Sequence, residues 1–254
     1  SQVFLRYLDA EEAAPIQGTA GASGPFFSPD GRWIGIFQEG KLTKVPIEGG
    51  TPQTIADAPS GRGAVWRSDG TIFFAPLQSG PIFQVPADGG TPRPVTTLDT
   101  TAGENSHRFP ELLDGGEVLL FTVRTGGGFE NAQIAAVRLS SGERKTLVRG
   151  GVHGRYLSTG HLMFAKGTTL MAAPFDVTRL ETLTSPAPLL EGVRYDGNGG
   201  ISDFAVSDTG TLVYAPASLQ AAPAELVRVS RDGVAQRVSE EPLPFRDVSV
   251  APNG

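Results

Sequence analysis

The stretch FFSPDGRWIGIF, residues 26–37, has the pattern of two β-strands joined by a tight turn. In the SPDG turn, residues 28–31, proline fixes φ, aspartate caps the turn and glycine takes the left-handed position. The apolar residues Trp33 and Ile34 then begin a second strand. The stretch therefore predicts one β-hairpin, and the fold depends on how often this hairpin recurs.

Turns of related sequence recur along the whole chain. They read FSPDG, WRSDG, ELLDG, YLSTG, VSDTG and VAPNG, and they close at the glycines in positions 31, 70, 115, 160, 210 and 254. Successive turns lie 39 to 50 residues apart, which is the period of four-stranded propeller blades. A solenoid of helix pairs shares this period, but the strand patterns inside each repeat exclude it.

Three further strands follow the turn strand in each repeat. The second is strongly apolar (WIGIF, TIFFAP, EVLLFTV, HLMFA and TLVYAP), the third alternates apolar and polar residues, and the fourth is polar with prolines, as suits an outer edge. We therefore predict an all-β fold, a single six-bladed β-propeller over residues 1–254. The predicted blades are approximately 20–58, 59–98, 104–149, 150–192, 199–240, and 244–254 paired with 1–18.

The sixth predicted blade combines the N-terminal and C-terminal segments and lacks a second strand within this sequence. Pairing of the two segments would close the ring and remove its open edges. An open array of sheets or a sheet sandwich is the alternative arrangement.

Composition narrows the classes of partner. The chain has 254 residues, 33 glycines, 20 prolines, no cysteine and a net charge of −6. The negative balance disfavours nucleic acid and anionic membranes, both of which attract basic surfaces. No apolar run approaches the roughly 20 residues of a membrane span, so we expect no membrane insertion of this segment. The absence of cysteine excludes disulfides and thiol nucleophiles.

Several longer phrases carry a family resemblance. They are LRYLDAEEAAPIQGTAGASGPFFSPDGRWIGIF, KLTKVPIEGGTPQTIADAPSGRGAVW, SHRFPELLDGG and RLETLTSPAPLLEGVR. The repeats resemble TolB-type propeller repeats, and the phrases resemble the propellers C-terminal to bacterial serine/threonine protein kinases. The resemblance implies a sensor or scaffold module in an extracytoplasmic or periplasmic location, within a longer membrane-tethered bacterial protein. No kinase motif is present in the sequence.

The first strands of propeller blades begin at one mouth of the central channel, and ligands usually bind there. Ionisable residues at these positions are expected to converge. Three arginines, Arg62, Arg108 and Arg246, predict capture of an anionic ligand such as a carboxylated sugar, a peptide end or a phosphate. Ser202 lies at the same level, and Tyr195 in the preceding loop is a candidate for stacking on a sugar or peptide.

A metal-dependent hydrolase acting on lactones, esters or phosphotriesters is the competing hypothesis. His107 or His153 would be the general base, and Asp203, Asp247 and Glu104 would hold calcium or another divalent metal. Few carboxylates stand among these arginines, which opposes a hard cation. In a third reading the charges pair with one another and the propeller is a structural spacer. The leading prediction is a non-catalytic module that binds a small molecule, a peptide or another protein.

Overall fold

The computed structural model describes residues 1–7, 12–207, 209–217, 227–230, 233–238 and 248–251. The described residues form an all-β fold that includes two short 3-10 turns, η1 (Thr100–Ala102) and η2 (Asp114–Gly116). None of the described helices is long and apolar enough to cross a membrane.

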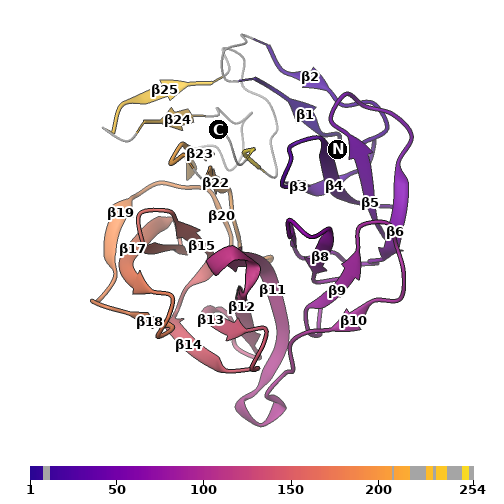
Figure 1. Cartoon of the computed structure of the whole chain (residues 1–254). Helices are drawn as coiled ribbons and strands as arrows, with labels where there is room; N and C mark the ends of the chain where they lie inside the picture. Colours follow the sequence, from indigo (N-terminus) through magenta and orange to yellow (C-terminus); the bar gives the residue numbers. More distant parts are fainter. Residues whose placement is uncertain (8–11, 208, 218–226, 231–232, 239–247, 252–254) are drawn as a thin grey trace.

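Five antiparallel sheets follow one another around a ring, as in a β-propeller (Figure 1). Blade one contains β3 (Ser23–Phe27), β4 (Trp33–Gln38), β5 (Lys41–Pro46) and β6 (Gln53–Asp57). Blade two contains β7 (Ala64–Trp66), β8 (Thr71–Phe74), β9 (Phe83–Pro86) and β10 (Arg93–Pro94). Blade three contains β11 (Glu104–Leu113), β12 (Val118–Thr125), β13 (Gly128–Arg138) and β14 (Arg144–Arg149).

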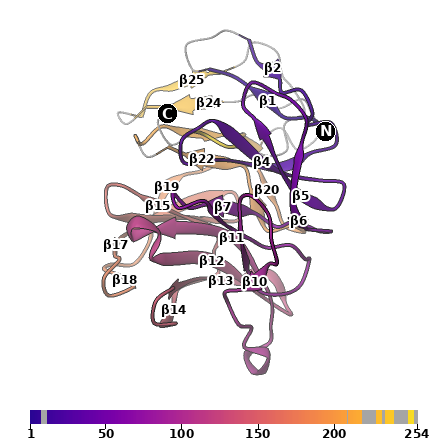
Figure 2. The ribbon, with the colours of Figure 1, turned by 45° about the vertical axis from the view of Figure 1, so that its right-hand side comes forward.

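Blade four contains β15 (Val152–Leu157), β16 (His161–Lys166), β17 (Thr169–Asp176), β18 (Glu181–Thr182) and β19 (Ala187–Leu190). Blade five contains β22 (Phe204–Val206), β23 (Leu212–Tyr214), β24 (Val227–Val229) and β25 (Ala235–Arg237). In all five blades each strand pairs with the next in sequence, and in blade four the outer edge of β17 pairs with both β18 and β19. In the turned view of Figure 2, the strands of blade three lie below those of blade one.

The prediction of six blades is wrong for the described residues, which form five. Where a sixth sheet was expected, they contain only a two-stranded ribbon, β1 (Phe4–Leu5) with β2 (Ala14–Pro15), beside blade one. Residues 248–251 of the predicted inner strand are not in strand conformation, and the neighbouring 246–247 and 252–254 lie outside the described residues. The physical reason is that two short strands supply too few ladder hydrogen bonds for a blade of their own.

The SPDG turn of blade one forms as predicted. The Ser28 hydroxyl donates to the Asp30 carboxylate at 2.6 Å and accepts from the Trp33 N–H at 2.9 Å. Gly31 has a φ of 69°, which a residue with a Cβ adopts only at a cost. These contacts fix the hairpin between β3 and β4 and hence the start of the blade.

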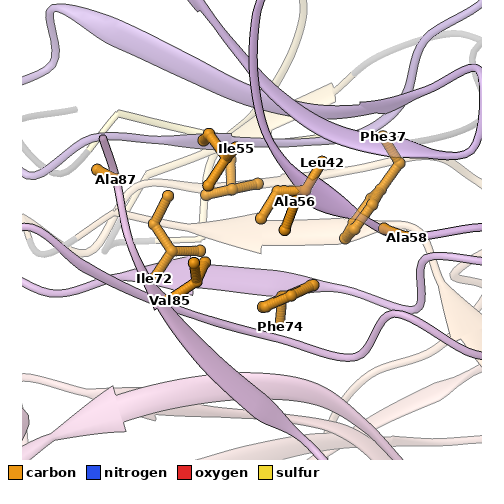
Figure 3. Packing of buried hydrophobic residues seen from close by; sticks show 10 residues of the cluster. Phe37, Leu42, Ile55, Ala56, Ala58, Ile72, Phe74, Val85 and Ala87 are labelled. Carbon is orange, nitrogen blue, oxygen red and sulfur yellow. The ribbon is translucent and has the colours of Figure 1, made fainter. Parts of the chain in front are cut away.

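The core lies between neighbouring blades. Figure 3 shows the contact between blades one and two, where side chains from both sheets meet, including Phe37, Leu42, Ile72 and Phe74. Similar clusters join blade two to three, three to four, and four to five. Burial of these faces holds the first strands side by side around the channel.

The first strands of blades three and four carry an irregularity near the channel mouth. Register shifts occur after Arg108 in β11 and after Val152 in β15, and Phe109 and His153 there have positive φ values of 51° and 54°. Gly63 has the equivalent place just before β7, with a φ of 93°. In a regular strand, side chains alternate between the two faces of the sheet. The irregularity interrupts this alternation for the residue that precedes it, Arg62 or Arg108.

Candidate functional site

The local sequence Gly61-Arg62-Gly63 holds Arg62 where three strands meet. Its N–H donates to the Ala75 carbonyl at 2.8 Å, and its own carbonyl accepts from the Phe109 N–H at 2.9 Å. A Cβ on Gly61 would lie 2.2 Å from the Phe37 ring, and one on Gly63 would lie 2.9 Å from the Phe109 Cα. Only glycine permits this approach, so the glycines position the backbone of Arg62.

Arg108 is buried at the same mouth, with 2% of its surface exposed. Its Nε donates to the Ser106 hydroxyl at 2.8 Å, its Nη1 to the Gly199 carbonyl at 3.1 Å and its Nη2 to the Gln78 carbonyl at 2.7 Å. All three acceptors are neutral oxygens. Burial, and then the charges of Arg62 and Arg124, lower the pKa of Arg108 to about 10.

Arg124 is a third member of this group. It lies opposite Ser106 in the pairing of β12 with β11, and its Nη1 donates to the Asn105 side-chain oxygen at 3.3 Å. The guanidinium carbons of Arg108 and Arg124 lie 5.0 and 5.4 Å from the centre of the Phe129 ring. We call Arg62, Arg108 and Arg124 the arginine cluster.

The arginine cluster has no carboxylate partner within the described part of the chain. None of the ion pairs found there involves these three side chains. The Nε atoms of Arg62 and Arg124 are buried and have no hydrogen-bond acceptor among the described residues. Buried positive charge without a counter-charge is costly unless an anion binds.

A polar cavity of about 270 Å³ adjoins Arg62. It lies between the β4–β5 turn and the loop that leads into β7, and its walls include Ser23, Gln38, Ser60 and Arg62. Gln38 donates both amide hydrogens inside the fold, to the carbonyls of Gly18 at 3.1 Å and Ala20 at 2.6 Å. Arg62 is the member of the arginine cluster that borders this cavity.

His107 is adjacent to Arg108 in sequence, but it belongs to a different network. It is fully buried, its ring centre lies 4.7 Å from that of Phe121, and its Nε2 donates to Glu104 at 3.1 Å. Its Nδ1 lies 2.8 Å from the Thr96 hydroxyl, which accepts from the Ile82 N–H and so donates to Nδ1. Burial lowers the pKa of His107 to about 4.

His153 is also held by both ring nitrogens. Its Nδ1 donates to the Ser202 carbonyl at 2.9 Å, and its Nε2 accepts from Arg155 at 2.9 Å. Arg155 in turn is paired with Glu111 of blade three at 2.7 Å. Burial lowers the pKa of His153 well below its ordinary value. Neither histidine has a free ring nitrogen, so this geometry does not support the predicted role of general base.

The two predicted metal ligands that the structure describes, Glu104 and Asp203, are each paired with an arginine. Glu104 receives a bidentate interaction from Arg144, and burial raises its pKa while the bonds from Arg144, Asp99 and His107 lower it, with a lowered pKa as the net result. Asp203 is paired with Arg194. Within the described residues no group of three or more histidine, aspartate or glutamate side chains is placed to hold a metal ion.

A second hollow, of about 350 Å³, borders Glu104 and Arg144 on the outer side of blade three. It is larger than the cavity beside Arg62, but its two central charges already neutralise each other. We therefore place the candidate site at the arginine cluster.

Four further residues were predicted to belong to the site: Tyr195, Ser202, Arg246 and Asp247. Tyr195 and Ser202 face each other in the pairing of β20 (Tyr195–Asp196) with β21 (Ile201–Ser202). Tyr195 packs against an apolar cluster that includes Phe129, and the Ser202 side chain is buried. Arg246 and Asp247 lie outside the described residues.

Sequence reasoning brought Arg62 and Arg108 together correctly but missed Arg124. The prediction rested on the first strand of each blade, whereas Arg124 lies near the end of the second strand of blade three. Its position one residue before the TGGG turn, on the strand that returns to the mouth, was the available signal.

Solved structures of β-propellers are similar to this chain at low sequence identity. A TolB protein of Agrobacterium tumefaciens aligns with a TM-score of 0.69 at 15% identity, over 89% of this chain and 84% of that one. TolB of Acinetobacter baumannii aligns with a TM-score of 0.68 at 17% identity, over 92% of this chain and 59% of that one. Regucalcin, a calcium-binding protein of Agrobacterium tumefaciens, aligns with a TM-score of 0.62 at 15% identity, over 85% and 73%.

No protein-family model matches the sequence. No curated protein matches it either. The comparisons establish the fold, a propeller similar to TolB structures. They do not bear on the resemblance to kinase-linked sensor propellers, which stays a prediction.

Proposed function

We propose that this propeller binds a small anionic ligand at the channel mouth through the arginine cluster. The observation that carries the proposal is Arg108, a guanidinium with 2% exposure whose described acceptors are all neutral oxygens. Charge-assisted bonds to carboxylate or phosphate are about twice as strong as bonds to neutral oxygens. A bound anion would offset the burial, and then the repulsion from Arg62 and Arg124, that lower the pKa of Arg108.

Two further features support binding at this place. The Nε atoms of Arg62 and Arg124 have no acceptor among the described residues, so neither guanidinium is fully hydrogen-bonded within the fold. The cavity beside Arg62 offers room for the rest of the molecule. No observation on the described residues favours the hydrolase alternative, because both buried histidines and the carboxylates Glu104 and Asp203 are engaged within the fold.

The proposal is tested by the stabilisation that phosphate and sulfate confer on the protein in a thermal-shift experiment. A ligand present at about 100 times its Kd stabilises the folded state by about 2.7 kcal/mol. The double variant Arg62→Gln, Arg124→Gln should lose this stabilisation while still folding. Arg93→Gln is the matched control, because Arg93 is exposed on the outer strand β10.

An equal shift in wild type and double variant would contradict the proposal. A shift that is lost in the Arg93→Gln control as well would do the same, because the effect would then follow overall charge rather than the cluster.

The sequence resemblance adds a proposal about context. We propose that the propeller works outside the cytoplasmic membrane as the ligand-sensing or protein-interaction part of a longer bacterial protein. Protease treatment of intact spheroplasts tests this: the propeller should be digested without lysis, and protection until lysis would contradict it.

A further inference from the structure

The cavity beside Arg62 indicates which class of anion the cluster receives. We infer that the ligand is a polyhydroxylated anion of monosaccharide size, with its charged group on the arginine cluster and its hydroxyl groups in the cavity. This inference rests on the proposed function and adds the chemical nature of the uncharged part of the ligand.

The cavity walls are polar and carry both donors and acceptors. Ser23 and Ser60 line it, and neither hydroxyl has a hydrogen-bond partner among the described residues. Gln38 spends its two amide hydrogens on Gly18 and Ala20, so its side-chain oxygen remains as an acceptor. Glu39 lies on the same wall and adds a carboxylate acceptor. A hydroxyl group both donates and accepts, so it matches such a surface better than a group that only accepts.

The walls of this cavity offer little apolar surface to a ligand. Its single aromatic wall, Phe37, is 6% exposed and belongs to the core between blades one and two. Glycines 21, 40 and 61 supply backbone rather than side-chain surface. An apolar ligand body would leave the hydroxyls of Ser23 and Ser60 without partners, which is unfavourable once water is displaced.

The size of the cavity limits the ligand. Its volume of about 270 Å³ is at the lower end of the roughly 300–1,000 Å³ typical of small-molecule pockets. One sugar ring is a suitable occupant, with Arg62 at the boundary between cavity and cluster. The anionic group is a carboxylate or a phosphate, since guanidinium groups bind both.

Four probes separate charge from hydroxyl groups in calorimetric titrations. Glucuronate and glucose 6-phosphate carry both features, glucose carries only the hydroxyls, and cyclohexanecarboxylate carries only the charge. We expect one or both sugar anions to bind at least about 10-fold more tightly than glucose or cyclohexanecarboxylate, a factor that corresponds to about 1.4 kcal/mol. Their relative affinity identifies carboxylate or phosphate as the charged group.

The double variant Ser23→Ala, Ser60→Ala should remove most of the advantage of the sugar anion and leave the affinity for cyclohexanecarboxylate unchanged. Ser140→Ala, at an exposed turn after β13, is the control and should change neither. Loss of affinity for both acids in the serine variant would indicate a structural effect and would overturn the inference.

The outcomes distinguish the inference from the proposed function. Equal binding of glucuronate and cyclohexanecarboxylate, with phosphate also bound, would overturn the ligand class and leave anion binding intact. Equal binding of glucose and the sugar anions, or no binding of any anion, would overturn both.

Discussion

At the scale of single residues, the central feature is Arg108, a buried arginine with no carboxylate partner among the described residues. The charges of Arg62 and Arg124 both act on Arg108, and its hydrogen bonds go to one hydroxyl and two loop carbonyls. Proteins rarely bury a charge unless it is paired. The proposed binding of an anion would account for this arrangement, which packing alone does not explain.

The two buried histidines make stability depend on pH. Burial lowers the pKa of His107 from 6.5 to about 4, and the pKa of His153 is lowered too. Between those values the unfolded chain binds protons that the folded chain does not, so stability is fully present above pH 6.5 and falls as the pH drops. His107 alone accounts for a loss on the order of 3 kcal/mol by about pH 4.

Urea unfolding measured at several pH values between neutral and mildly acidic conditions checks this expectation. His107→Gln should flatten the pH dependence, because it removes a group whose pKa is lowered by burial. A wild-type stability that stays constant over this range would show that the histidines are not held neutral.

The sequence predicted which residue types lie at the channel mouth better than it predicted the directions of their side chains. Arg62 and Arg108 point to a common site as expected, since both precede a residue with positive φ. His107 and Arg108 were assigned to the same mouth, but neighbouring residues of a strand face opposite sides. His107 therefore enters the interface between blades two and three. An alignment of the repeats gives the position of a residue along its strand, but not the face of the sheet on which its side chain lies.

At the scale of elements, the approach of the first strands depends on Gly63. A Cβ there would lie 2.9 Å from the Phe109 Cα, and the φ of Gly63 is 93°. Gly63→Ala should cost roughly 2–4 kcal/mol from backbone strain and the steric contact together. It should also weaken anion binding, because Arg62 would move.

The variant Gly70→Ala separates the effect of backbone strain from that of steric contact. Gly70 has a φ of 88°, but no atom lies within 4 Å of its added Cβ, so this variant carries only the strain, roughly 1–2 kcal/mol. Denaturant unfolding and phosphate titration of both variants check the prediction. Equal losses of stability would show that the contact with Phe109 is not tight.

The strand order within each blade followed from turn chemistry and alternation, because both signals are local. The ribbon formed by β20 and β21 was not expected, since its two strands have two residues each. Such short pairs have no periodicity to detect. Gly199 in its loop supplies an acceptor to Arg108, so an element invisible in the sequence completes the site.

At the scale of the whole molecule, stability comes from faces buried between blades. Phe121 is fully buried between blades two and three and contacts His107 and the guanidinium of Arg144. Phe121→Ala should cost about 3–5 kcal/mol. Phe4→Ala is the control with little effect, because Phe4 is 48% exposed. Denaturant unfolding of both variants measures the difference, and similar losses would contradict an inter-blade core.

The described residues form five blades, one fewer than the six turn motifs predict. The sixth motif lies at 250–254, and its residues 252–254 are outside the described part of the chain. A turn motif alone does not predict a complete blade. The net charge of −6 likewise says nothing of the local positive cluster at the mouth.

Anomalous diffraction from crystals grown with selenate tests the central claim most directly, because it locates a bound anion without assuming its identity. We predict an anomalous peak within hydrogen-bonding distance of the guanidinium groups of Arg108 and at least one of Arg62 and Arg124. Selenate bound only elsewhere on the surface, with no peak at the arginine cluster, would contradict the assignment of this mouth as an anion-binding site.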